Sequence, residues 1–356
     1  MTDPSTRIVQ DAPPGVSTAD AELIAGELFG VHGTARSLGS NQDLNFVIAV
    51  PGAAPKLLKI ANPATTAAEL EAQSRAARVL AAAGIRAPQA ATLPGGTTVH
   101  EVDVDGRTMR ARLLDFLEGR TLSGGGHLSH AAVAAIGRLA ASVDRALAGV
   151  DDPAAERVSQ WDLARTPAVL PLLVPSVADA ALRWRLERAA DAAWAQVAPL
   201  ADRLPVQTIH GDLTDDNVVV GDALAGLPDG VIDLGDLCRT WRVAELAITV
   251  SSLLHHDGVG VADAMRAVTA YHAALPLDEA EVDALWPLVV LRATVLVASA
   301  HRVLRDDPGN DYAADNLAHE LAILAAAQSV PLRVGTALAR LAAGSEVTPL
   351  ALPAPA

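Results

Sequence analysis

The first 116 residues alternate between apolar and polar positions in a way that predicts a small sheet. Such alternation is typical of strands with one buried face. It predicts five strands, over residues 35–40, 45–50, 56–60, 99–104 and 108–116. The Asp105-Gly106 dipeptide between the last two strands is typical of a tight hairpin turn. Helical spacing predicts a helix over residues 18–29, with its N-cap at Ser17 or Thr18, and an Ala-rich helix over residues 67–83.

After about residue 117, the spacing of apolar residues changes to the period of helices. This period predicts six helices, over residues 129–147, 178–197, 243–254, 261–274, 279–304 and 312–329. Two β-branched runs, 218–220 and 231–232, flank a Gly/Pro/Asp-rich turn and predict a hairpin embedded among these helices. The predicted fold class is therefore α+β, with a small antiparallel-sheet N-lobe and a mainly helical C-lobe.

The length of 356 residues is sufficient for two lobes that each have a core of their own. Residues 1–18 are rich in Pro, Asp, Ser and Thr, which predicts a mobile N-terminal segment. The N-lobe is expected over residues 19–116 and the C-lobe over residues 117–344. Residues 345–356 contain three prolines and are expected to form a tail or a linker.

The polar residues of segment 209–236 indicate the chemistry. His210-Gly211-Asp212 is followed by Asn217 five residues after the aspartate, and Asp233 lies on the second strand of the predicted hairpin. Kinase-type phosphoryl transfer needs a carboxylate that accepts the proton of the acceptor hydroxyl, together with an Asn and a second Asp that hold magnesium ions. An acidic surface hairpin is the alternative. The joint occurrence of His-x-Asp-x-x-x-x-Asn and Ile-Asp-Leu-Gly-Asp favours the catalytic interpretation.

The chain has only two lysines, Lys56 and Lys59, and both lie on the predicted third strand. A kinase uses a lysine on this strand to hold the nucleotide phosphates, and a glutamate on the next helix to pair with it. Lys59 is the better candidate because apolar residues flank it, and the next helix contains Glu69 and Glu71. The alternative is a lysine that is merely solvated at the end of a strand.

Composition excludes some classes of function. The formal net charge of −15 argues against binding a nucleic-acid backbone, which needs a basic surface. It is compatible with a cationic small substrate, and equally with a role in solubility alone. One cysteine, Cys238, excludes an internal disulfide and makes the cytoplasm the expected compartment. No signal peptide is visible in the first 15 residues. The apolar stretch 284–300 contains Arg292, which favours a buried helix over a membrane span.

The order of these motifs resembles the aminoglycoside phosphotransferase and choline kinase superfamily. Within that superfamily the chain is most similar to the hydroxylysine kinase branch. The resemblance covers residues 20–335 and is carried by Asp43-Leu44-Asn45-Phe46, Leu70-Glu71-Ala72-Gln73, and Ile232-Asp233-Leu234-Gly235-Asp236 followed by residues 243–249. It implies a protein-kinase-like fold and a small-molecule kinase. It also implies that Asp212 is the catalytic base, that Asn217 and Asp233 bind Mg²⁺, and that Lys59 contacts the phosphates and pairs with Glu71.

The resemblance also implies a nucleotide site. A turn would cover the nucleotide and a hinge between the lobes would meet the base; their residues are Gly39, Ser40, Asn41 and Asp43 in the turn, and Asp115, Phe116 and Leu117 in the hinge. The sequence departs from the family at Leu234, where the family has Phe, and in the turn, which has one glycine. Relatives in this branch often use GTP, so the phosphate donor is expected to be ATP or GTP.

The expected substrate is a small amino-bearing alcohol, with 5-hydroxylysine or a similar hydroxy-amino acid preferred. Four carboxylates near the motif in sequence could meet an ammonium group: Asp215, Asp216, Asp236 and Glu245. Arg292 either pairs with an internal acid such as Glu245 or binds a substrate carboxylate with its planar fork. Homoserine, choline, ethanolamine and aminoglycosides are alternative acceptors. A further alternative is a non-catalytic kinase-like module of a larger multidomain protein, although all five catalytic groups are present.

Overall fold

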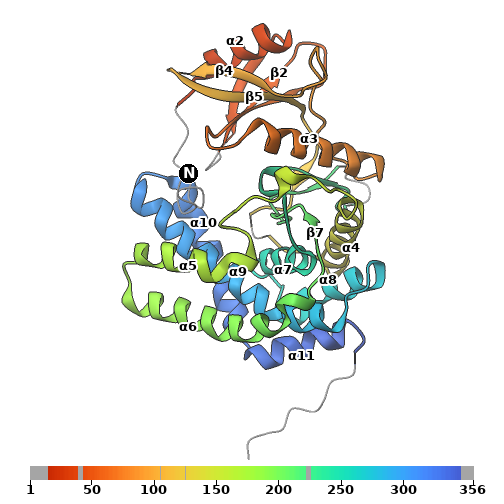
Figure 1. Ribbon diagram of the computed structural model, residues 1–356, viewed down its shortest axis with the longest axis vertical. Coiled ribbons are helices and arrows are strands. Elements are labelled where there is room, and N and C mark those ends of the chain that lie inside the picture. Colours follow the sequence, from red (N-terminus) through yellow and green to blue (C-terminus); the bar gives the residue numbers. More distant parts are fainter. Residues whose placement is uncertain (1–14, 39–42, 105, 125, 222–225, 346–356) are drawn as a thin grey trace, which may run out of the picture. The chain divides into compact units, whose positions relative to one another are not determined.

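Figure 1 presents the computed structural model of the chain, which describes residues 15–38, 43–104, 106–124, 126–221 and 226–345. The chain divides into two compact units. The first unit comprises residues 1–122, 143–165 and 207–240, and the second comprises residues 123–142, 166–206 and 241–356. The first unit is thus larger than the predicted N-lobe, because residues 143–165 and 207–240 group with the N-terminal residues.

The first unit contains a five-stranded antiparallel sheet, as predicted. Its strands follow the order β1-β2-β3-β5-β4. Their bounds are Thr34–Leu38 for β1, Leu44–Ala49 for β2, Lys56–Ala61 for β3, His100–Val104 for β4 and Arg107–Asp115 for β5. Each strand is paired with the next in this order. Residues that stand directly opposite each other on two paired strands therefore have their side chains on the same face of the sheet.

Two helices accompany this sheet (Figure 1). Helix α2, Thr18–Phe29, begins after Ser17, whose hydroxyl accepts the amide of Asp20 in a capping box. Its Ala21 and Ala25 pack into a core with apolar residues of the sheet, among them Phe46 and Ile60. Helix α3, Ala67–Ala82, begins at an equivalent capping box between Thr66 and Glu69. These caps explain why the sequence predicted both helix starts closely.

The motif segment forms short strands in the same unit. Strands β8, Val218–Val220, and β9, Gly230–Val231, pair antiparallel, which confirms the predicted hairpin. Strand β6, Arg120–Thr121, extends it to the order β6-β8-β9, and β7, Val206–Ile209, pairs with β10, Cys238–Trp241. The strands β6, β7 and β10 are too short to be recognised from alternation alone.

The second unit is helical, as predicted, and α9 lies at its centre. Its helices are α5, Thr166–Leu173; α6, Ala180–Val197; α7, Arg242–Leu253; α8, Val261–Ala274; α9, Glu279–Asp306; α10, Asp311–Gln328; and α11, Leu332–Ala342, while α4, His130–Leu147, starts here and ends in the first unit. Helix α9 contacts α5, α6, α7, α10 and α11. The sequence missed α5, which contains Pro171, and α11, which follows Pro331.

Helix α9 is the part of the described chain that is long and apolar enough to cross a membrane. Helices α10 and α11 meet the same test only together, as one span bent by 85°. In α9, however, 89% of the apolar window is buried inside the protein. Its apolar surface is therefore used for packing among the helices of its unit.

Candidate active site

The loop after β7 is held in place by its histidine and its glycine. The buried His210 ring donates from Nε2 to the carbonyl of Ile232 at 2.9 Å and accepts the amide of Asp212 at Nδ1, at 3.3 Å. These two partners define the neutral tautomer with hydrogen on Nε2. Gly211 has φ +83°, and a Cβ there would lie 2.2 Å from the carbonyl oxygen of Asp236. Only glycine fits, so this loop approaches residues 233–236 closely.

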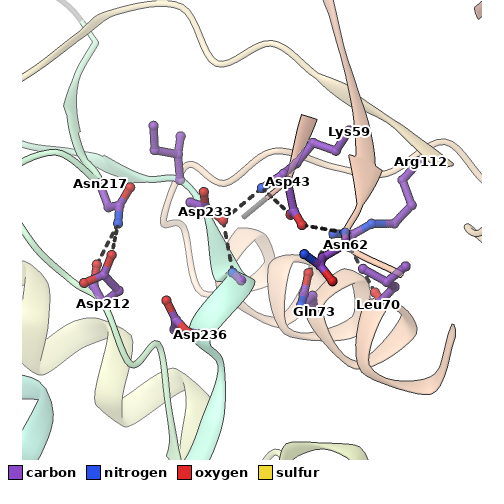
Figure 2. A network of polar contacts seen from close by, with 12 residues as sticks. Asp43, Lys59, Asn62, Leu70, Gln73, Arg112, Asp212, Asn217, Asp233 and Asp236 are labelled. Atoms are coloured by element: carbon purple, nitrogen blue, oxygen red, sulfur yellow. Dashed lines mark hydrogen bonds and ion pairs between the residues drawn. The ribbon is translucent and has the colours of Figure 1, made fainter. Parts of the chain in front are cut away.

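Asn217 orients the carboxylate of Asp212. The Asn217 Nδ2 group donates to the backbone carbonyl of Asp212 and to its Oδ2, both at 2.8 Å. The Asn217 carbonyl accepts the amide of Ile232, which anchors the residue beside the second strand of the hairpin. Figure 2 shows the two side chains facing each other. The two polar residues of the motif are thus in direct contact.

Asp233 has an unusual backbone conformation. Among the described residues it is the only one other than glycine with positive φ, at φ 57° and ψ 77°. A non-glycine residue in this region costs about 1 kcal/mol or more, and such residues cluster at functional sites. The turn is stabilised because Oδ1 accepts the amide of Gly235 at 3.1 Å. The same oxygen accepts a hydrogen bond from Lys59 Nζ at 2.9 Å (Figure 2).

The charge of Lys59 keeps Asp233 ionised. Only 6% of Lys59 is exposed, whereas 42% of the Asp233 side chain is exposed. Burial would raise the pKa of Asp233, but the charge and hydrogen bond of Lys59, together with the Gly235 amide and His210, lower that pKa to about 2. Burial likewise would lower the pKa of Lys59, but Asp233 and Asp43 raise it. Asp43 Oδ2 lies 3.7 Å from Lys59 Nζ, and Asp43 Oδ1 accepts the amide of Asn62 at 3.0 Å.

The predicted pair between Lys59 and Glu71 is wrong for this structure. The Glu71 carboxylate accepts hydrogen bonds from the Thr97 hydroxyl at 2.6 Å and from the Thr98 amide. These bonds lower the pKa of Glu71, although burial raises it. Glu71 therefore stabilises the segment before β4, because a backbone amide and a hydroxyl there offer it two donors. Glu69, the other candidate, caps α3 through the amide and hydroxyl of Thr66.

The residues expected to surround the nucleotide are only partly described. Gly39, Ser40 and Asn41 lie outside the described residues. Asp115 ends β5, where its carboxylate accepts Lys56 at 2.8 Å and its amide donates to Gln89 at 2.9 Å.

Leu117, also predicted for the hinge, lies against β9. A Cβ at Gly230 would be 3.1 Å from its Cδ2. The hinge role of Asp115, Phe116 and Leu117 stays a prediction.

Arg157 is a residue of this site that the sequence did not reveal. Its Nη1 donates to the carbonyl of Gly235, its Nη2 lies 3.9 Å from Asp236 Oδ1, and its Nε lies 3.9 Å from Glu69 Oε1. Arg157 thus links the turn after Asp233 to the start of α3. A lone arginine in the polar stretch 151–160 carries no local signal of such a role.

The predicted substrate residues have different surroundings. Asp215 is buried, and its carbonyl accepts the amide of Leu122, whereas Asp216 is exposed. Asp236 lies beside Gly211 and Arg157, as described above. Glu245, on α7, is buried in the second unit. The roles of these four carboxylates in substrate binding stay predictions.

Arg292 lies on α9 and only 3% of it is exposed. Burial raises the pKa of Glu320, on α10, to about 8, and the charge of Arg292 opposes this rise. Glu320 is therefore an internal acid within electrostatic reach of Arg292, and the sequence did not indicate it. Whether Arg292 also binds a substrate stays a prediction.

The donor set of the first unit fits a magnesium ion. Mg²⁺ prefers oxygen ligands and is usually held by one or two carboxylates together with substrate phosphates. Asp233 offers an ionised carboxylate with access to solvent, and Asn217, directly before β8, offers an amide oxygen. Asp212 and Asn217 lie on one side of Asp233, and Lys59 and Asp43 on the other (Figure 2).

These groups and this fold define a phosphotransferase that acts on an alcohol group. The chain belongs to the phosphotransferase enzyme family, whose model matches residues 34–285. Its fold is that of the protein-kinase-like small-molecule kinases, as the sequence predicted. This also confirms the predicted resemblance at the level of the superfamily.

Individual proteins resemble the chain at low sequence identity. A hydroxylysine kinase of Danio rerio is 25% identical over 323 residues, which are 85% of this chain and 89% of the relative. The structure of a microcompartment-associated aminopropanol kinase has a TM-score of 0.66 at 17% identity and covers 88% of this chain and 97% of its own. The structure of an amicoumacin kinase in complex with AMP-PNP and Ca²⁺ has a TM-score of 0.62 at 14% identity. The match covers 85% of this chain and 91% of the kinase.

Proposed function

We propose that the protein transfers the γ-phosphoryl group of ATP or GTP to the hydroxyl of an amino-bearing alcohol. A hydroxy-amino acid such as 5-hydroxylysine is the preferred acceptor. The observation that carries this proposal is that Asp212, Asn217, Asp233 and Lys59 lie in one unit. Asn217 is hydrogen-bonded to Asp212, and Lys59 is hydrogen-bonded to Asp233. These are the groups that kinase-type transfer requires.

Asp212 is the general base of the proposed reaction. The acceptor hydroxyl gives its proton to the Asp212 carboxylate while its oxygen bonds to the γ-phosphorus. The bond from that phosphorus to the bridging oxygen of the nucleotide breaks, and the nucleoside diphosphate leaves. Asn217 holds the base in place through its bond to Oδ2. Positioning of this kind supplies much of the rate in phosphoryl transfer, because little covalent chemistry is left to the protein.

Asp233 and Asn217 would hold Mg²⁺, and Lys59 would bind the phosphates. A bound magnesium ion neutralises the negative charge of the phosphate chain. Lys59 adds a buried positive charge, and its low exposure fixes the direction of its ammonium group. The relative that binds AMP-PNP with a divalent ion supports a nucleotide donor of this kind.

The acceptor class is supported by the relatives and by the charges of the chain. The hydroxylysine kinase and the aminopropanol kinase act, by their names, on amines that carry a hydroxyl group. The net charge of −15 favours a substrate with a cationic amine over a nucleic acid. The proposal places the reaction in the cytoplasm, without a membrane partner. Membership of a larger multidomain chain stays open to direct test.

A panel assay tests the proposal. The purified chain is incubated with Mg²⁺ and either ATP or GTP, together with 5-hydroxylysine, homoserine, choline, ethanolamine or an aminoglycoside. Nucleoside diphosphate release and the mass of the product are measured, and the Asp212→Asn variant serves as the inactive control. Turnover with 5-hydroxylysine above all others supports the proposal. Turnover only with amines that lack a carboxylate would refute the amino-acid acceptor, and nucleotide binding without any turnover would favour the non-catalytic module.

A further inference from the structure

Lys59 has no glutamate partner on α3, yet it lies next to another buried cation. Glu71 is engaged with Thr97 and Thr98, as described above. In the β3–β5 register, Lys59 stands directly opposite Arg112. Cross-strand partners in an antiparallel pair share one face of the sheet, with Cβ atoms about 5 Å apart. Arg112 is therefore the immediate neighbour of the phosphate-binding lysine.

Arg112 connects this face of the sheet to α3. Only 3% of it is exposed. Its Nη1 donates to the carbonyl of Leu70 at 3.0 Å and lies 3.4 Å from the Ser74 hydroxyl, and its Nη2 donates to Gln73 Oε1 at 2.6 Å. The guanidinium thus holds positions 70, 73 and 74, which lie on one face of the helix. Figure 2 shows it reaching from β5 to Leu70 and Gln73.

Carboxylates act on both Lys59 and Arg112. Burial lowers the pKa of both cations, Asp43 and Asp233 raise both, and Glu71 also raises that of Arg112. The positive charge of Arg112, which stands beside Lys59, also lowers the pKa of the lysine. The Lys59 ammonium lies on the Asp233 side of the cluster, where it donates to Asp233 Oδ1 at 2.9 Å.

We propose that Arg112 is a positioning residue for Lys59. It replaces the glutamate of the usual lysine–glutamate pair as the link between α3 and the sheet, and its charge orients the Lys59 ammonium toward the phosphates. This inference rests on the proposed function, in which Lys59 binds the nucleotide. Arg112 itself makes no contact with the reacting atoms; it acts through Lys59 and α3.

A double-mutant cycle in the full chain tests this coupling. The dissociation constants of AMP-PNP and GMP-PNP are measured with Mg²⁺ for wild type, Lys59→Met, Arg112→Met and the double variant, and the melting temperature is recorded for each. Arg112→Met is expected to weaken nucleotide binding about five- to 50-fold in the wild-type background, the scale of coupling between contacting residues. In the Lys59→Met background it is expected to weaken binding by less than about twofold. A merely structural arginine would lower the melting temperature in both backgrounds and weaken binding by the same factor in both, which would overturn the proposal.

Two further variants complete the experiment. Arg112→Lys keeps the charge of the arginine but loses its planar fork. It is therefore expected to weaken nucleotide binding nearly as much as Arg112→Met does. It replaces Arg112→Met in the experiment if that variant does not fold. Wild-type binding by Arg112→Lys would overturn the role of the fork. Arg110→Met is the matched control on the same strand, since Arg110 is bonded to the Thr65 carbonyl instead, and it is expected to leave both dissociation constants unchanged. If wild type binds neither nucleotide, or Lys59→Met binds as wild type does, the proposed function fails; if only the coupling is missing, this inference fails alone.

Discussion

Lys59 donates a hydrogen bond to Asp233 at 2.9 Å, although 174 positions of sequence separate the two residues. The lysine comes from a strand of the sheet, and the aspartate comes from the turn that follows the hairpin of the motif segment. One partner is buried and the other is reached by solvent. The contact therefore joins the expected phosphate-binding and metal-binding groups within a single unit.

Lys59→Met is expected to lower kcat about 10²-fold or more, the scale for removing one preorganised donor of positive charge. Lys56 is its matched control, because residues three apart on a strand face opposite sides. Lys56 is more exposed and pairs with Asp115 at 2.8 Å, so Lys56→Met is expected to change kcat by less than about threefold. Steady-state kinetics with a verified acceptor measure both variants, and equal losses would contradict the assignment of Lys59.

Asp212→Asn is expected to lower kcat about 10²- to 10⁴-fold, the usual effect of losing a general base. Because the amide occupies nearly the same volume, the melting temperature and the dissociation constant of AMP-PNP should change little. Asp202→Asn, at an exposed position of the second unit, is the control and should leave kcat unchanged. Full turnover by Asp212→Asn would show that another group accepts the proton.

Magnesium together with nucleotide is expected to raise the melting temperature, because a ligand that binds only the folded state stabilises it by mass action. Asp233→Asn should abolish the part of this shift that depends on magnesium. Asparagine tolerates the positive φ of this position, so the loss can be attributed to the carboxylate and not to the turn. Differential scanning fluorimetry with and without the metal measures the shift. An unchanged magnesium-dependent shift in the variant would show that the Asp233 carboxylate is not needed to bind the metal.

Local signals explain which parts of the fold could be predicted. Ser17 and Thr66 are side-chain caps at fixed distances from acidic partners, so the starts of α2 and α3 were evident. The hairpin of β8 and β9 follows from its valine runs. Prolines near α5 and α11 interrupt the helical pattern, so those helices were missed. The short strands β6, β7 and β10 depend on partners that are distant in sequence.

The site shows the same difference between local and distant signals. Asp212 and Asn217 belong to one motif, so both residues could be singled out from their spacing in the sequence, whereas the hydrogen bonds between them are seen only in the structure. The partner of Glu71 could not be predicted, because two donors before β4 compete for its carboxylate, and no local pattern reveals them. Arg112 was missed because an arginine on an amphipathic strand usually faces solvent. Its burial depends on the acceptors that α3 presents, which only the folded chain brings near.

Glu320 is expected to make stability depend on pH. Its ordinary pKa is 4.5, and burial raises it to about 8 in the folded chain, against the opposing charge of Arg292. A pKa that is raised in the folded chain stabilises the fold at pH values below the ordinary pKa. This contribution is lost as pH rises through the pKa of the folded chain. Wild type should therefore lose stability relative to Glu320→Gln between pH 4.5 and about 8, and the difference should be constant above that range.

Urea unfolding at several pH values measures this difference for Glu320. Glu187→Gln, at an exposed position of α6, is the control, and its profile should follow that of wild type. Parallel profiles for wild type and Glu320→Gln would show that Glu320 titrates as an ordinary solvated acid.

Arg292→Lys is expected to raise KM for hydroxy-amino acids about tenfold or more, because lysine cannot reproduce the bidentate contact of arginine with a carboxylate. The KM for ethanolamine, which has no carboxylate, should change little. Kinetics with 5-hydroxylysine and ethanolamine give the two values for each variant. If Arg292 serves only to balance Glu320, Arg292→Lys should instead lower stability and affect both acceptors alike. In that case Glu320→Gln should restore part of the lost stability, because it removes the buried acid that Arg292 opposes.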